Sequence, residues 1–406
     1  MFRLGRLVNR KVFTLLALAV AMFLIATNVQ AGLLYLVSSG IVGLIIVSYL
    51  IPLWSVRSLS VMRRAPVEAF ENTPVALEAV VHNQGRWPRA LIAVRDGLVP
   101  LARPVTGWVP GRGEATLSYE GALPRGVYRE APLTITCAAP FGVWTAHRDL
   151  VAPAGLTVFP LYEDIPTLPI LEAMSSPAET LHERRSAGAG YDYLGIRDYR
   201  RGDSLRVVHW RSSARRGELV VKEFEEEIAA PVTVVIATSG IAGTAGNTTL
   251  DAAARLAATI ANYCLNAGHP LQLLSWNPVG GLISLDRPAL PQTLEWLASL
   301  QPAPAGTPEK LAEEAAARLA QRSTVILVTP STAADWAGVA ATIQARRARL
   351  LTVLIDRESF GGRGEENGGL TEVADRLAEA RSTVYTYRKD ESLRSCLSDS
   401  WRVTAP

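Results

Sequence analysis

The residue types best suited to chemistry gather in one stretch of the chain, residues 184–227. Arginine, tyrosine and tryptophan alternate there with glycine, and glutamates follow at positions 223, 225, 226 and 227. Arginine guanidinium groups beside aromatic rings can bind phosphate groups or single-stranded nucleic acid. The same guanidinium groups form bidentate ion pairs with carboxylates. The stretch is therefore an anion site, an internal network of ion pairs, or a surface for a protein partner.

No complete catalytic or phosphate-binding motif accompanies these residues. The pattern G-x-x-x-x-G-K-[ST] is absent, and no G-x-G-x-x-G lies between a strand and a helix. His209 has no Ser, Cys or carboxylate tied to it by a recognisable motif, and it adjoins Trp210. The neighbouring glutamates would compete with a bound anion. We therefore favour an ion-pair network or a protein-protein surface, and we expect no enzyme; a hydrolase that uses Asp203, His209 or Cys264 is the alternative.

The stretch has a specific resemblance. Residues 190–218 read GYDYLGIRDYRRGDSLRVVHWRSSARRGE, which resembles the signature of a bacterial family catalogued as domain of unknown function 58. Position 209 is His where the family pattern has an acidic residue. The signature positions, which we take as candidate interaction residues, are Gly195, Arg197, Tyr199, Gly202, Asp203, Arg206, Trp210, Ala214, Arg215, Gly217 and Glu218.

The resemblance also implies an organisation and partners. Family members have two N-terminal membrane passes, a β-rich module, the signature, and a domain similar to the von Willebrand A domain. They are often encoded beside MoxR-type AAA+ ATPases and transglutaminase-like membrane proteins. The resemblance thus implies a membrane-anchored scaffold or adaptor that works with such an ATPase in complex assembly or stress response. Anion or nucleic-acid binding by the arginines is the alternative to this adaptor.

The N-terminal part of the chain must place this stretch near a membrane. Residues 12–56 contain no charged side chain, and this length fits two passes within residues 12–51 better than one. Basic residues precede the first pass and follow the second, at Arg57, Arg63 and Arg64, whereas the connecting turn has none. The positive-inside rule then puts both termini and the bulk of the chain in the cytoplasm, at the inner (plasma) membrane. A signal peptide and a buried soluble hairpin are the rival interpretations.

Four regions follow along the chain. We expect a transmembrane helical hairpin over residues 1–57. Short β-prone runs separated by turn residues predict a β-sandwich-like module over residues 58–160. Residues 161–230 are expected to form a linker and the arginine-rich signature. Alternating strand and helix patterns over residues 231–406 predict a mostly parallel sheet with one antiparallel edge hairpin, similar to a von Willebrand A domain.

The metal site of such a domain is degraded in this sequence. A metal-ion-dependent adhesion site begins with D-x-S-x-S after the first strand, and its oxygen ligands suit a hard divalent ion. Here Ala237, Ser239 and Ile241 occupy those three positions. We therefore expect no metal and no cofactor, and we interpret Thr238 and Ser239 as turn or helix-capping hydroxyls. Three scattered cysteines indicate a reducing compartment rather than a disulfide framework.

Overall fold

The computed structural model describes residues 2–4, 10–169, 171, 193–200, 208–224, 231–303, 308–319, 323–330, 336–346, 348–362 and 369–398. The chain forms two compact units, one of Met1–Leu161 with Leu297–Ser299, and one of Tyr162–Trp296 with Leu300–Pro406. Each unit is described by itself below.

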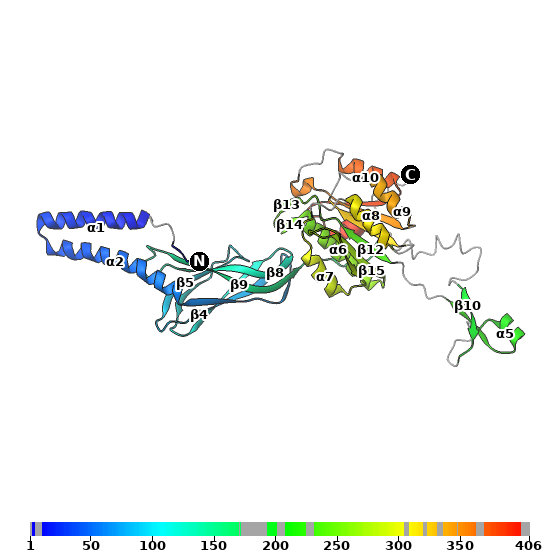
Figure 1. The fold of residues 1–406 in the computed structure, drawn as a ribbon, viewed down its shortest axis with the longest axis horizontal. Helices are drawn as coiled ribbons and strands as arrows, with labels where there is room; N and C mark the ends of the chain where they lie inside the picture. Colours follow the sequence, from blue (N-terminus) through cyan, green and yellow to red (C-terminus); the bar gives the residue numbers. More distant parts are fainter. Residues whose placement is uncertain are drawn as a thin grey trace. The chain divides into compact units, whose positions relative to one another are not determined.

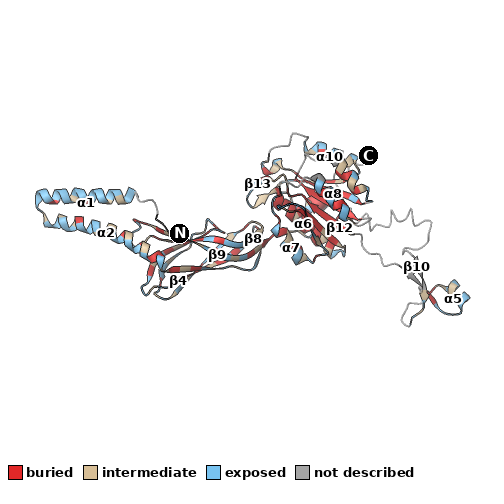
Figure 2. Cartoon of the chain, viewed as in Figure 1, coloured by how far each residue is buried: buried red, intermediate tan, exposed pale blue. Residues whose placement is uncertain are grey.

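The chain begins with an apolar two-helix hairpin. Helix α1 (Arg10–Val29) and helix α2 (Gly32–Arg57) are both long and apolar enough to cross a membrane. They lie side by side (Figure 1), and Phe23 makes an edge contact with Tyr35 near the turn, with ring centroids 5.7 Å apart. Most of their large side chains are exposed, as the pale blue of Figure 2 shows. α2 continues through Pro52, six residues beyond the predicted end at Ile51.

Small residues let the two helices approach. Ala19 and Ala26 of α1 and Ser38 of α2 are buried, whereas the large apolar residues around them are mostly exposed. Close helix packing through small residues is typical of membrane proteins, in which the outer face meets lipid rather than water. The burial pattern therefore fits a hairpin surrounded by hydrocarbon.

Two antiparallel sheets follow and share one core, which we call the β domain. The smaller sheet has the order β2-β4-β7, and the larger has β1-β9-β8-β5-β6, with β3 added in parallel to β9. Both sheets contribute fully buried side chains to a common hydrophobic cluster, such as Leu77, Ile92 and Ile135. The strands are β1 (Phe2–Leu4), β2 (Leu59–Arg64), β3 (Glu68–Phe70), β4 (Pro74–Asn83), β5 (Arg89–Asp96), β6 (Val105–Val109), β7 (Glu114–Ala122), β8 (Gly126–Cys137) and β9 (Ala146–Phe159).

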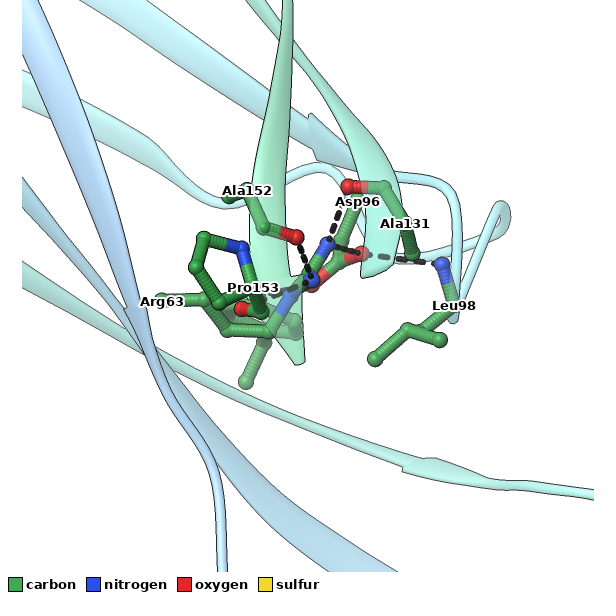
Figure 3. A network of polar contacts seen from close by, with 7 residues as sticks. Arg63, Asp96, Leu98, Ala131, Ala152 and Pro153 are labelled. Atoms are coloured by element: carbon green, nitrogen blue, oxygen red, sulfur yellow. Dashed lines mark hydrogen bonds and ion pairs between the residues drawn. The ribbon is translucent and has the colours of Figure 1, made fainter. Parts of the chain in front are cut away.

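An ion pair crosses this core (Figure 3). Arg63 of β2 and Asp96 of β5 both have fully buried side chains, and they meet through two hydrogen bonds of 2.8 and 2.6 Å. The Arg63 guanidinium also donates to the carbonyls of Ala131 and Ala152, at 3.3 and 3.2 Å. Asp96 accepts from the Tyr119 hydroxyl of β7 at 2.5 Å and from the backbone N–H of Leu98. Arg63 is thus a core residue of the β domain.

The end of α2 is fixed to the β domain. Nη1 of Arg148, on β9, donates to the carbonyls of Val56, Arg57 and Leu59 at 3.4, 3.3 and 2.8 Å. These carbonyls lie at or just past the helix C-terminus, where a cation also offsets the helix dipole. β1, which precedes α1, pairs with β9 of the same domain. Both ends of the hairpin therefore lie at the β domain.

The second unit contains a six-stranded sheet of order β16-β15-β12-β17-β18-β19. All neighbours are parallel except the edge strand β16, which is antiparallel to β15. Strands buried on both faces explain the continuous apolar runs of the sequence. The strands are β12 (Val232–Ile236), β15 (Leu271–Trp276), β16 (Leu282–Asp286), β17 (Thr324–Thr329), β18 (Arg349–Ile355) and β19 (Thr383–Tyr387).

Helices cover this sheet. α8, α9 and α10 share one hydrophobic cluster with the strands, whereas α6 packs on β12, β15, β17 and β18 outside that cluster. The capping box of Thr248 and Asp251 starts α6. The helices are α6 (Thr249–Asn266), α7 (Leu290–Ser299), α8 (Pro308–Arg318), α9 (Trp336–Gln344), α10 (Leu370–Glu379) and α11 (Leu393–Ser398).

The segment after the β domain is not a free linker at its start. Glu163 donates its backbone N–H to Thr259 Oγ1 at 3.2 Å, and Asp164 accepts from Asn262 Nδ2 at 2.7 Å. Leu168 and Leu171 are buried. The chain therefore packs on α6 before it reaches the arginine-rich stretch.

Candidate functional site

The described part of the arginine-rich signature folds as a small element of two strands and one helix. β10 (Tyr193–Asp198) pairs antiparallel with β11 (Val220–Phe224), and α5 (Trp210–Arg216) packs against β11. Gly195 and Arg197 lie on β10, and Tyr199, just beyond it, donates its N–H to Leu219 O at 2.9 Å. The predicted positions Gly202, Asp203 and Arg206 lie outside the described residues.

Local capping holds α5 in place. His209 is the N-cap, and its Nδ1 accepts from the backbone N–H of Ser212 at 3.2 Å. The buried Ser213 hydroxyl accepts from Val220 N at 2.9 Å, which joins helix to strand. Gly217 ends the helix at φ +76°, a left-handed conformation that glycine adopts without a Cβ penalty. His209 therefore has a structural role as the cap of α5.

The outer face of α5 is aromatic and basic. Trp210 is 63% exposed, and Arg211, Ala214 and Arg215 are exposed as well. Residues four apart share a helix face, so Trp210 stands over Ala214 and Arg211 over Arg215. The seven-residue helix thus presents a compact patch, which we call the α5 face.

Ion pairing within this element is sparse. Arg216 lies 4.0 Å from Asp198, and both side chains are largely exposed, so this pair contributes about 0–1 kcal/mol. Arg211 and Arg215 have no ion-pair partner among the described residues. Glu218 is exposed. The acidic positions expected to complete a network, Asp203 and Glu225 among them, lie outside the described part of the chain.

A second place to look for function is the carboxyl end of β12. β15 and β17 flank β12 on opposite sides, and ligands of open α/β sheets bind where the strand order reverses in this way. Ala237 there donates its N–H to Val328 O at 2.9 Å, while Ser239 and Ile241 are half-buried. These three positions supply one hydroxyl and no carboxylate. The donor set does not fit a divalent cation, which requires several oxygen ligands and negative charge.

Two further polar residues, Thr238 and Asp356, do not complete a ligand site. Thr238 is 1% exposed, and its hydroxyl has no hydrogen-bond partner among the described residues, so its interpretation as a capping hydroxyl is wrong. Asp356, after β18, accepts from the N–H groups of Glu358 and Ser359 at 3.1 and 3.4 Å and lies 3.6 Å from Arg388 Nε. It closes a turn. Among the described residues, no group of three His, Cys, Asp or Glu side chains could hold a metal.

The three cysteines are buried and unpaired. Burial raises the pKa of Cys264 to about 12 and that of Cys396 to about 12, because the thiolate loses its hydration. A thiol with such a pKa is protonated near neutral pH and is a poor nucleophile. This argues against the hydrolase alternative that relied on Cys264.

Sequence reasoning missed the structural roles of Ser213 and Arg148. Nothing in their local sequence marks them, since each acts through a contact that only the fold creates.

Comparisons with known proteins point to one family. Residues 195–395, about half of the chain, match the family described as "Protein of unknown function DUF58". No curated protein matches the chain. The CARDB domain of a Pyrococcus furiosus protein is similar at 14% identity and a TM-score of 0.16, covering 23% of this chain and 86% of that one. The GH20 exo-β-N-acetylglucosaminidase of Vibrio harveyi shows 8% identity and a TM-score of 0.17, over 74% and 57% of the two chains. Structural likeness at this level decides nothing about the fold.

Proposed function

Since the chain belongs to the DUF58 family, we propose that it is a membrane-anchored cytoplasmic scaffold or adaptor that binds a protein partner through the α5 face. The observation that carries this proposal is the exposure of Trp210 beside Arg211 and Arg215, which lack ion-pair partners in the described chain. Tryptophan and arginine are the side chains most enriched at the energetic centres of protein interfaces. The resemblance of the signature names the partner class, a MoxR-type AAA+ ATPase, with a transglutaminase-like membrane protein as a second candidate.

The remaining architecture supports an anchored adaptor. The two apolar helices supply the anchor, and Arg10 and Lys11 at one end with Arg57 at the other favour a cytoplasmic location for both ends. The strand order with one antiparallel edge supports a von Willebrand A-like second domain. Without the Asp carboxylate at position 237 and the second Ser hydroxyl at position 241, such a domain would bind partners through its surface rather than through a metal. We propose no enzymatic activity for the chain.

Capture of the partner tests the proposal. The full chain, tagged and extracted from native membranes in mild detergent, should retain an AAA+ ATPase identified by mass spectrometry. The triple variant Trp210→Ala, Arg211→Ala, Arg215→Ala should reduce capture at least about tenfold, because hot-spot truncations commonly cost more than 1.4 kcal/mol. The control is Lys310→Ala with Arg318→Ala, which removes two exposed cations from α8. Equal capture by both variants and the wild type would contradict the role of the α5 face.

Anion or nucleic-acid binding is the second candidate function. The exposure of Arg211 and Arg215, without ion-pair partners among the described residues, favours it, since guanidinium groups bind phosphate. Phosphate-dominated binding weakens steeply as salt is added. Single-stranded oligonucleotide binding that falls with salt, and falls further in the α5 triple variant, would support this candidate; no binding at low salt excludes it.

A further inference from the structure

Tryptophans gather at the end of the β domain that adjoins α2. Trp54 belongs to α2, Trp87 to the β4–β5 connection, Trp108 to β6 and Trp144 to the β8–β9 connection. Trp108 pairs with Ala90, at the start of β5, which places it at the same end. Three of the four rings are at least half exposed, at 50% for Trp54, 67% for Trp87 and 60% for Trp108. Amphipathic rings of this kind concentrate at the interface between membrane and water.

The length of α2 puts this end at the depth of lipid headgroups. α2 has 26 residues and spans about 39 Å, whereas a hydrocarbon core of about 30 Å needs about 20 residues. Counted from Gly32, the core ends near Ile51, so Trp54 lies about one turn beyond it. Trp144 makes an edge contact with Tyr49 at 5.3 Å between ring centroids. The β8–β9 connection, whose Phe141 is 56% exposed, therefore reaches the last apolar turn of the helix.

A pocket of about 410 Å³ opens at this level. Its lining includes Ile51, Trp54, Trp87, Arg89, Leu91 and Pro140. Leu91 has φ +52° and is 47% exposed. The left-handed conformation costs a side chain such as Leu about 1–2 kcal/mol. The half-exposed Leu91 side chain is thus part of the apolar lining of the pocket.

The polar group of the pocket is a buried arginine without an anion. Arg89 is 3% exposed. Its Nε donates to Ser58 Oγ at 3.1 Å, and its Cζ lies 3.4 Å from the centre of the Trp54 ring. No carboxylate pairs with it among the described residues. Burial lowers the pKa of Arg89, because desolvation disfavours the cation. A buried cation of this kind is costly until an anion joins it.

We propose that this pocket binds the headgroup phosphate of an anionic glycerophospholipid, with Arg89 as the phosphate ligand and Trp54 and Trp87 beside the glycerol. The proposal rests on the membrane anchoring proposed above. A lipid fits better than free phosphate because Ile51 and Leu91 offer apolar surface that continues into the membrane-spanning part of α2. Exposed Arg57, Arg86 and Arg112, on α2 and the connections at the same end, add attraction to anionic lipid.

Lipid retention by the full chain tests this site. The protein in non-ionic detergent is mixed with phosphatidylglycerol or phosphatidylcholine, and bound lipid is counted by native mass spectrometry. Wild type should bind phosphatidylglycerol at least about tenfold more tightly, because the choline cation of phosphatidylcholine offsets the phosphate charge and repels the Arg89 cation. Arg89→Gln should abolish the preference. Arg95→Gln, an exposed position on the same strand β5, should keep it.

A second pair of variants serves in case Arg89→Gln does not fold. Trp87→Ser removes an exposed lining residue and should weaken phosphatidylglycerol binding several-fold, whereas Trp108→Ser removes an exposed tryptophan that does not line the pocket and should leave binding unchanged. Equal effects of the two variants on phosphatidylglycerol binding would overturn the proposed lipid site. Displacement of the lipid by millimolar inorganic phosphate would also overturn it, in favour of a free-phosphate site.

Sodium carbonate extraction separates this inference from the proposed function. A chain released from membranes by carbonate would contradict the anchoring and the lipid site together. A chain that stays in the membrane but binds both lipids equally would overturn the lipid site alone.

Discussion

Two buried arginines of the β domain contrast in what surrounds them. Arg63 meets a carboxylate, and carbonyls take its remaining donors. Arg89 has one hydroxyl and one aromatic face, and it lines a pocket. A cation whose donors are all used inside the protein stabilises the fold or its specificity. A buried cation that has no anion beside it within the domain can instead bind an anionic ligand. The contrast separates a structural arginine from a binding arginine in one domain.

Loss of one partner of the Arg63–Asp96 pair is expected to have the largest effect. Arg63→Ala leaves the Asp96 carboxylate buried and uncompensated, which should lower the free energy of unfolding of the β domain by about 3–5 kcal/mol. Hydrogen exchange of β-domain amides measures this without interference from the second unit. A double variant, Arg63→Met with Asp96→Leu, should recover much of the loss. If Arg63→Ala lowered the free energy of unfolding by less than about 1 kcal/mol, Arg63 would not differ from Arg89 as a structural residue.

The Tyr119 hydroxyl is expected to matter next. Tyr119→Phe removes one donor to Asp96 but leaves the ion pair, so we expect a loss of about 1–3 kcal/mol. Hydrogen exchange of the same amides measures it. Tyr128→Phe is a suitable control, since that hydroxyl donates to Pro124 O, in a turn away from the ion pair.

High pH should act on the same residue. Burial, and then the hydrogen bond to Asp96, raise the pKa of Tyr119 above its ordinary value. Because the folded-state pKa is raised, its contribution to stability is complete below the unfolded pKa of about 10 and is lost as the pH rises above it. Thermal unfolding of the wild type between pH 8 and about 11 should therefore show a decline that is smaller in Tyr119→Phe. Identical pH profiles would contradict the raised pKa.

Arg89→Gln should have the smallest effect on stability. No described carboxylate is orphaned by the change, so the free energy of unfolding should shift by less than about 1 kcal/mol, in either direction. A loss as large as that of Arg63→Ala would make Arg89 a second structural arginine. Hydrogen exchange under the same conditions provides the comparison.

The sequence predicts the elements of this chain better than its contacts. The apolar run of α1 and α2 and the strand–helix alternation of the second unit depend on local periodicity, which sequence shows directly. The predicted antiparallel edge hairpin, for example, corresponds to β15 and β16. The burial of Arg63 was not predicted, because three arginines after an apolar run have the same local pattern whether they face water or enter a sheet core. Only the packing of β2 against the other sheet, whose strand β5 carries Asp96, distinguishes the two cases.

The candidate site shows the same limit. The signature marked Trp210 and Arg215 but not the exposure of their side chains, and the capping role of His209 depends on a hydrogen bond to Ser212 that spacing alone does not reveal. The lipid pocket was missed entirely. Its lining comes from residues between Ile51 and Pro140 that no sequence window contains together.

Spin labels test the placement of the pocket at headgroup depth most directly. Because Cys137, Cys264 and Cys396 are buried, a label introduced by Phe141→Cys can be read in the full chain in phosphatidylglycerol bilayers. The control is Leu101→Cys, a 95% exposed position in the connection after β5, at the opposite end of that strand from Arg89. The label at position 141 should be accessible to oxygen and shielded from a water-soluble nickel chelate, and the label at 101 should show the reverse. Equal access of the chelate to both positions would contradict a membrane-seated end of the β domain.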